Sequence, residues 1–131
     1  MIVNAGRAVI SARLYGTGSA AFSSIGIGTG TTAAAATDTA LQTEVTASGG
    51  AAAGVHALPA ASVTPSSTTT TVTNDTAQWT GTISITGTIA ITECGLFNAD
   101  TNGTMLAHQV FAAVNVGSGD SFAPTWKVKN A

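Results

Sequence analysis

The chain has 131 residues, four basic and six acidic side chains, and a formal net charge of −2, a size that suits one domain or one domain with an extended arm. Charged residues make up 8% of it, against about 25% in an ordinary soluble domain, so a monomer would have little charge to keep it apart from its neighbours. The sequence has no basic cluster for nucleic acid and no apolar run of membrane-spanning length. We therefore expect a subunit of a larger assembly, with neither nucleic acid nor membrane as a partner.

The N-terminus and the single cysteine narrow the class of protein further. Residues 1–6 lack the basic start and apolar core of a signal peptide, so we expect the mature chain to begin at or near Met1. Cys94 stands alone, which excludes an intrachain disulfide, gives no metal-ligand spacing and fits folding in a reducing cytoplasm. We expect no metal and no cofactor.

The first thirty residues predict extended structure. Residues 4–15 alternate loosely in size and polarity, which favours a strand or an extended arm over about residues 1–15. Gly16–Gly30 is rich in Gly and Ser around Phe22, Ile25 and Ile27, which indicates a loop with a short strand. Within it, Gly26–Gly30 has neither the glycine spacing nor the lysine of a phosphate-binding loop, so we expect a turn-rich connection there.

The middle of the chain offers one helix and one ambiguous segment. Asp38–Val45 is the one plausible helix: Asp38 or Thr37 can cap it, and Thr39 with Gln42 resembles a capping box. Residues 46–71 are low in complexity and end in a run of threonines, whose β-branched side chains favour extended backbone. We expect a long loop or an edge strand there.

The second half of the chain predicts strands. Between residues 78 and 92, apolar side chains occupy odd positions and Thr or Ser most even ones, which predicts a strand with one buried face that bends or breaks at Gly81 or Gly87. Met105–Val116 returns across a hairpin turn at residues 98–104, a second turn spans residues 117–120, and the last strand covers residues 122–128. The prediction is a single all-β domain over residues 1–131, an antiparallel β-sandwich or jelly roll with one short helix.

Glu93 falls on the apolar positions of the alternating strand. One interpretation is a strand-end residue at which the alternation has already broken. The other is a buried carboxylate that accepts backbone N–H bonds from a neighbouring loop, or that pairs with Arg7 or Arg13, because an unpaired buried charge is costly. We favour the second and expect Glu93 to fix the hairpin in place.

Catalytic and metal-binding interpretations of the same region are weaker. Cys94 with His56 or His108 would need an electropositive setting, which the neighbouring sequence does not supply. Glu93 with Asp100 or Asp120 resembles a glycosidase pair, but aromatic residues are only 5% of the chain, too few to suggest a sugar-binding groove. We expect Asp100 and Asn102 to shape their turn, since they provide too few oxygens for calcium.

Three segments resemble small virion proteins of tailed bacteriophages, which are described as capsid decoration (cement) or tail-fibre-like proteins. They are Ile25–Glu44, Ile89–Phe111 and Val116–Val128. The second contains an E-x-G-L-F motif and a glycine turn, and the structural positions are Asp38, Glu44, Glu93, Gly95, Leu96, Phe97 and Gly103. His108 stands where such proteins often have arginine, which removes an arginine partner for Glu44 or Glu93.

The resemblance implies a non-enzymatic structural protein of the virion. The expected form is a homotrimer on the outer capsid surface that binds and stabilises the shell of the major capsid protein, after synthesis in the cytoplasm of the bacterial host. The short chain favours the capsid over a fibre. The alternative is a tail or baseplate component such as a tail-fibre attachment domain, and a third class is a small hydrolase of cell-surface glycan.

Overall fold

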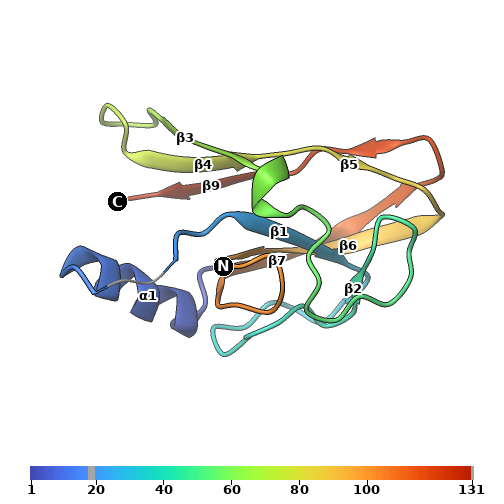
Figure 1. Ribbon diagram of the computed structural model, residues 1–131, viewed down its shortest axis with the longest axis horizontal. Helices are drawn as coiled ribbons and strands as arrows, with labels where there is room; N and C mark the ends of the chain where they lie inside the picture. Colours follow the sequence, from blue (N-terminus) through green and yellow to red (C-terminus); the bar gives the residue numbers. More distant parts are fainter. Residues whose placement is uncertain (18–19, 131) are drawn as a thin grey trace.

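Antiparallel sheets stacked in two layers form the body of the protein, with one helix at an end (Figure 1). The computed structural model describes residues 1–17 and 20–130. The elements in chain order are α1 (Asn4–Leu14), β1 (Ser24–Gly28), β2 (Glu44–Val45), the 3-10 turn η1 (Ala60–Ser62), β3 (Thr64–Thr68), β4 (Thr76–Thr80), β5 (Ile83–Ser84), β6 (Ile89–Phe97), β7 (Met105–Val116), β8 (Ser121–Phe122) and β9 (Thr125–Lys129). The predicted all-β, sandwich-like fold with one helix is confirmed.

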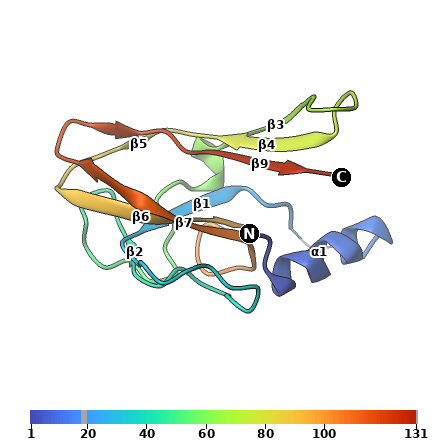
Figure 2. The same ribbon diagram turned by 180° about the vertical axis from the view of Figure 1, so that it is seen from behind.

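One layer is a four-stranded sheet in the order β2-β1-β6-β7. The other contains a three-stranded sheet in the order β3-β4-β9 and the β5-β8 pair. Figures 1 and 2 show both layers from opposite sides. Between them lies the main core, to which the isoleucines at positions 25, 27, 83, 85, 89 and 91 contribute. Trp79, Phe122 and Trp126 are partly buried against it.

A layer of loops covers the other face of the four-stranded sheet. We call residues 29–59, which connect β1 to η1 and include the short strand β2, the loop layer; Figure 1 shows them on the side of the sheet away from β4 and β9. Glycines of β1 make this close approach possible, because a Cβ at Gly26 would lie 2.5 Å from Oε1 of Glu44. The two central strands are therefore buried on both faces: every residue of β1 is buried, and so is every residue of β6 except Ala90.

The N-terminal segment is a helix, so the predicted strand or arm over residues 4–15 is wrong. Gly6, Val9 and Ile10 lie at helical spacing on the face of the helix that packs against β7 and the core. At Gly6 an added Cβ would lie 2.5 Å from the backbone oxygen of Leu106, so the contact requires glycine. Loose alternation among small residues was too weak a signal to distinguish a strand from this helix.

The helix predicted over Asp38–Val45 is also wrong, because this segment consists of turns that lead into β2. Asp38 does not cap a helix that follows it. Its Oδ2 accepts a hydrogen bond from the N–H of Ala35, which precedes it, and so closes a turn. The side chain of Gln42 likewise reaches back, to the backbone of Thr32. The polar residues of the predicted capping box stabilise turns.

Most predicted strands are present. The alternating strand breaks at both glycines, into β4, β5 and β6, and β7 has the predicted bounds. Residues 46–71 contain both predicted alternatives, a long loop and then the edge strand β3. The prediction of turns at Gly26–Gly30 is wrong for its first half, since Gly26, Ile27 and Gly28 belong to β1. That strand pairs with both β2 and β6.

Candidate functional site

An irregularity in β6 explains why an acid follows the isoleucines of the strand. The pairing of β6 with β7 shifts register between Ile91 and Glu93. Ile91 and Cys94 both face the main core, so the side of the strand that faces the core changes between them. Thr92 and Glu93 both contact Gly30 of the loop layer: Thr92 donates to its carbonyl at 2.7 Å, and its N–H donates to Glu93 at 3.1 Å. A β-bulge re-aims side chains in this way.

Glu93 is completely buried and joins the loop layer to the sheet. Its carboxylate accepts hydrogen bonds from the backbone N–H groups of Gly30, Gln42 and Thr43, at 2.8 to 3.1 Å. Nε2 of His108 lies 2.9 Å from Oε2 of the same carboxylate. The predicted buried carboxylate with backbone amides around it is confirmed, and an imidazole occupies the place considered for an arginine.

The prediction that Glu93 fixes the 98–104 hairpin is wrong, because its amide partners lie in residues 30–43. The hairpin has its own ties. Oδ1 of Asn98 accepts from the N–H of Thr104, and Oδ1 of Asp100 accepts from the hydroxyl of Ser24 and the N–H of Ala60. The hydrogen bond from Ala60, followed by that from Ser24, lowers the pKa of Asp100. Asp100 was predicted to shape its own turn, and it also connects this turn to β1 through Ser24 and to η1 through Ala60.

His108 bridges two acids. Its Nδ1 lies 2.7 Å from Oδ2 of Asp38, and its Nε2 contacts Glu93. The pKa of Asp38 is lowered by the hydrogen bond from Ala35 and then by that to His108. Asp38 therefore serves the loop layer as an anion. We call Asp38, Glu93 and His108 the first cluster.

A second cluster consists of Glu44 and His56, both buried. Nδ1 of His56 lies 2.6 Å from Oε1 of Glu44, and its Nε2 lies 2.8 Å from the carbonyl oxygen of Asn102. Burial acts to lower the pKa of His56, but the hydrogen bonds to Glu44 and Asn102 and the charges of Glu44 and Asp100 raise it above its ordinary value. The imidazole also stacks on the ring of Phe97, with centroids 3.7 Å apart.

The other motif residues have packing roles. Gly95 leaves room for Leu41 and for the ring of Phe97, which would lie 3.0 and 2.9 Å from an added Cβ. Leu96 lies in the main core. Phe97 packs with Val3, Leu41 and Met105 in a smaller cluster. Gly103 adopts a φ of 74° in the hairpin turn, a conformation that favours glycine.

Cys94 is not brought together with either histidine. Its side chain lies in the main core, where Nε1 of Trp126 donates to its sulfur at 3.2 Å. Burial raises the pKa of the Cys94 thiol to about 12, so the thiolate needed for nucleophilic attack is absent near neutral pH. Asp120 accepts from the N–H of Gly117 within its turn. Cys94 therefore contributes to core packing, and Asp120 closes its own turn.

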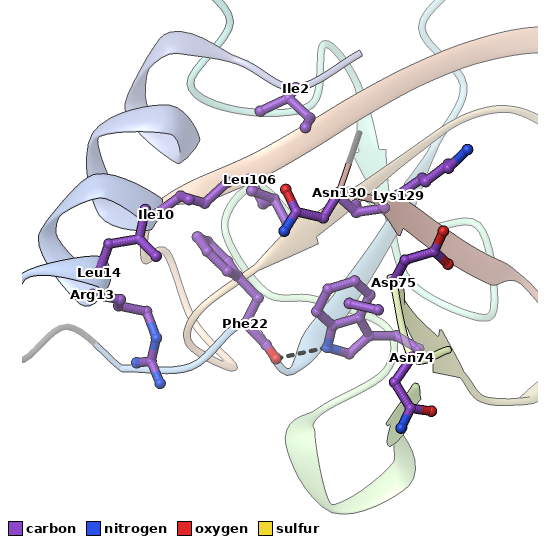
Figure 3. Close-up of a pocket in the computed structure, with 13 residues that line it drawn as sticks. Ile2, Ile10, Arg13, Leu14, Phe22, Asn74, Asp75, Leu106, Lys129 and Asn130 are labelled. Atoms are coloured by element: carbon purple, nitrogen blue, oxygen red, sulfur yellow. Dashed lines mark hydrogen bonds between the residues drawn. The ribbon is translucent and has the colours of Figure 1, made fainter. Parts of the chain in front are cut away.

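Two apolar grooves lie elsewhere on the surface. The first, of about 560 Å³, runs between α1 and the end of the sandwich; Figure 3 shows Ile10 and Leu14 on one side of it and Asp75 and Lys129 on the other. Among the lining residues, Nε1 of Trp79 donates to the carbonyl of Phe22 at 2.9 Å. The second, of about 740 Å³, is lined by residues of β6 to β9, which include Phe111, Phe122 and Trp126, and by Pro124. The residues that line these grooves do not include the histidines or acids of either cluster.

The pairing of both histidines with acids was missed from the sequence, although Asp38, Glu44 and Glu93 had been singled out. The signal was compositional: in a chain with only 8% charged residues, two histidines are a conspicuous supply of partners for acids at buried positions. Their positions in sequence gave no further guide, because His56 lies in the low-complexity segment and meets Glu44 only through the folding of the loop layer.

Among residues 1–17 and 20–130, no group of three or more His, Cys, Asp and Glu side chains is arranged to hold a metal ion. Within that same part of the chain, no helix has the length and apolar character needed to cross a membrane. Comparisons with protein-family models, with curated proteins and with solved structures found no match to this chain.

Proposed function

We propose that this protein is a non-enzymatic structural subunit of a tailed-phage virion, a capsid decoration protein that binds copies of itself and the shell of the major capsid protein. The observation that carries the assembly role is the contrast between the outer edge of β7 and the other sheet edges. An unpaired edge presents a row of backbone donors and acceptors to any other strand, so proteins protect the edges that should stay free.

The other edges carry recognised protection. β2, at the far edge of the four-stranded sheet, has only two residues, and so do both strands of the β5-β8 pair. β3 contains Pro65, which has no backbone donor, and β9 carries Lys127 and Lys129. These features make pairing with a further strand unfavourable.

β7 lacks such protection over most of its length. The N-terminal segment pairs with its outer edge only near Ala107, opposite Ile2, with hydrogen bonds to Leu106 and His108. Beyond that point, residues 109–116 contain no charge and no proline, and Val114 is 40% exposed. The irregular pairing between Val110 and Val114 protects the edge locally, as a bulge does, so the unprotected parts are the regular stretches on either side of it. Strand addition to an edge of this kind is a common mode of protein–protein binding.

The buried clusters support a structural interpretation. The histidines and acids of both clusters lie between the loop layer and the sheet, where they form hydrogen bonds with other groups of the protein. In the described residues, no buried side-chain nitrogen or oxygen lacks a hydrogen-bond partner. A catalytic acid or base needs to reach a substrate proton. The clusters contribute instead to the rigidity of a subunit with few surface charges.

Substitution at the β7 edge tests the proposal. A lysine at position 114 should prevent strand addition, whereas Ser66→Lys places the same charge on the already protected strand β3 and is the matched control. Light scattering should show the wild type and Ser66→Lys as the same oligomer and Val114→Lys as a monomer with an unchanged circular dichroism spectrum. Pairing of β7 with β7 of a second copy gives a dimer, whereas the trimer expected from the sequence requires β7 to contact a different surface of the next copy.

Binding to phage particles tests the virion role separately. Particles that lack the protein should bind the wild type in many copies and resist heat and osmotic shock better afterwards. A few copies per particle would place the protein in the tail and overturn the capsid assignment. A wild type that stays monomeric and binds no particle would overturn the whole proposal.

A further inference from the structure

We propose that each of the two histidine–carboxylate clusters traps one proton when the chain folds, so that the native protein has no net charge at neutral pH and the loop layer is a pH-sensitive cover of the sheet. This inference rests on the contacts of the two imidazole rings and does not depend on the proposed function.

The first step is to count the hydrogens at His56. A carbonyl oxygen can only accept, so the 2.8 Å contact with Asn102 requires a hydrogen on Nε2. The 2.6 Å contact between Nδ1 and Glu44 requires a second hydrogen between its two atoms. A neutral imidazole carries one hydrogen on nitrogen. The second cluster therefore holds one proton more than a neutral histidine and an ionised acid would.

The same count applies to His108. Both of its ring nitrogens face carboxylate oxygens, at 2.7 Å for Asp38 and 2.9 Å for Glu93. An ionised carboxylate only accepts, so each contact again requires a hydrogen. Glu93 also accepts from three backbone N–H groups, so donors surround its carboxylate, and we assign the extra proton of this cluster to the imidazole. His108 is therefore an imidazolium between two anions.

The other charged groups around the clusters are few. The N-terminal ammonium of Met1 donates to the carbonyl oxygen of His108 at 2.9 Å, and Arg7 on the neighbouring helix α1 is exposed. Asp100 adds a negative charge near His56. None of these groups provides a hydrogen for the ring contacts themselves.

The trapped protons cancel the charge of the chain. The formal net charge is −2 with both histidines neutral, and the two trapped protons bring −2 + 2 to zero. An unfolded chain above about pH 6.5 releases both protons and returns to −2. The native and unfolded states of the chain thus differ in net charge by two at slightly alkaline pH.

Loss of the proton from either cluster would leave a ring nitrogen and a carboxylate oxygen, both hydrogen-bond acceptors, in contact inside the protein. Both clusters lie where the loop layer meets the sheet: Asp38, Glu44 and His56 belong to the loop layer, and Glu93 and His108 to β6 and β7. The main core on the other face of the sheet contains neither histidine. Alkaline pH should therefore first release the part of the loop layer that holds the amide partners of Glu93, and leave the sandwich folded, including Val45 and Leu58 in the main core.

Nitrogen-15 NMR of the histidine rings tests the proton count in the intact protein. At pH 7.5 both native histidines should show two protonated ring nitrogens, and urea should convert both to the neutral form. The His56→Gln and His108→Gln variants assign the two sets of signals. A native histidine with an unprotonated ring nitrogen at this pH would overturn the proposal for its cluster.

Charge and hydrogen exchange test the consequences. Asp38→Asn should return His108 to the neutral form and leave His56 protonated, whereas Asp120→Asn, which removes the same charge from an exposed turn, should change neither ring. On raising the pH, the N–H groups of Gly30, Gln42 and Thr43 should lose protection while the fluorescence of Trp79 and Trp126 stays native. Simultaneous loss of both signals would overturn the separate release of the loop layer.

Discussion

Nε2 of His108 lies 2.9 Å from Oε2 of Glu93, and neither side chain is exposed to solvent. The two residues are diagonal neighbours on β6 and β7, since Glu93 pairs with Val110 and Gly95 pairs with His108. Diagonal neighbours on one face of a sheet are within reach of long side chains. Both side chains therefore lie on the same face of the sheet, the face against which residues 30–43 pack.

Glu93→Gln should destabilise the protein by about 3–5 kcal/mol, the cost of breaking a buried ion pair by removing one partner. The carboxylate of Glu93 accepts hydrogen bonds from four donors, whereas the amide of Gln has only one oxygen that can accept. The NH₂ group of the Gln side chain would also face N–H groups, to which it cannot form hydrogen bonds. Urea denaturation followed by tryptophan fluorescence measures the loss. Asp120→Asn, the same change of charge in an exposed turn, should cost less than about 1 kcal/mol. Equal effects of the two substitutions would contradict the role of Glu93.

The strands were predictable because their signals are local. Alternation gives β4 to β6, and Gly81 and Gly87 mark the breaks in that run. The helix α1 was not predictable in this way, since its face is set by contact with Leu106, which lies a hundred residues away in sequence. Asp38 suits both a helix cap and a turn, and the tertiary contact with His108 favours the turn.

The site was predictable only as far as Glu93. An acid on the apolar positions of an alternating strand predicts a buried carboxylate, but the alternation would direct it into the main core, whereas Glu93 faces the loop layer. Which groups surround it depends on the path of residues 29–59, whose composition of Ala, Gly and Thr has no periodicity. The bulge that turns Glu93 away from the main core is a property of pairing with β7 and leaves no mark in β6 alone.

Gly6→Ala should detach α1 from the sheet. The methyl group would lie 2.5 Å from the oxygen and 2.6 Å from the Cα of Leu106, and these backbone atoms of β7 cannot move aside. We expect a loss of stability of about 1–3 kcal/mol, as for overpacking in general, and faster hydrogen exchange in residues 4–14. Gly117→Ala is the matched control, since its nearest atom would lie 3.9 Å away. Unchanged protection of the helix in Gly6→Ala would contradict this packing.

Cys94 should be inert in the native protein. The raised pKa of about 12 and burial in the main core leave almost no thiolate at pH 8. Ellman's reagent should therefore react with the folded chain at least about a hundredfold more slowly than with the chain in urea, where the ordinary thiol pKa of about 8.5 applies. Rapid modification without unfolding would mean that the groove beside Phe111 and Trp126 admits the reagent to the sulfur.

Stability should pass through a plateau as the pH changes, with Asp38 contributing to the acid side and His56 to the alkaline side. The pKa of Asp38 is lowered in the folded state, so its contribution is present above its unfolded pKa and is lost as the pH falls through the folded value. The pKa of His56 is raised, so its contribution is complete below about pH 6.5 and is lost as the pH rises through the folded value. Free energies of unfolding from urea titrations across the pH range measure both sides.

Single substitutions should separate the two sides of this plateau. His56→Gln should reduce the alkaline side to the part that the trapped proton of the first cluster contributes. It should keep the acid side, because Asp38 retains its contacts with Ala35 and His108. Asp38→Asn should reduce the acid side, and the remaining acid loss should come from other stabilised carboxylates such as Asp75, whose pKa is lowered to about 2 by hydrogen bonds from Val72, Thr70 and Thr71 and from the side chain of Thr76. A wild type whose stability rises steadily from pH 6 to pH 9 would contradict the sign of the His56 contribution, since a histidine with a raised pKa can only lose stability over that range.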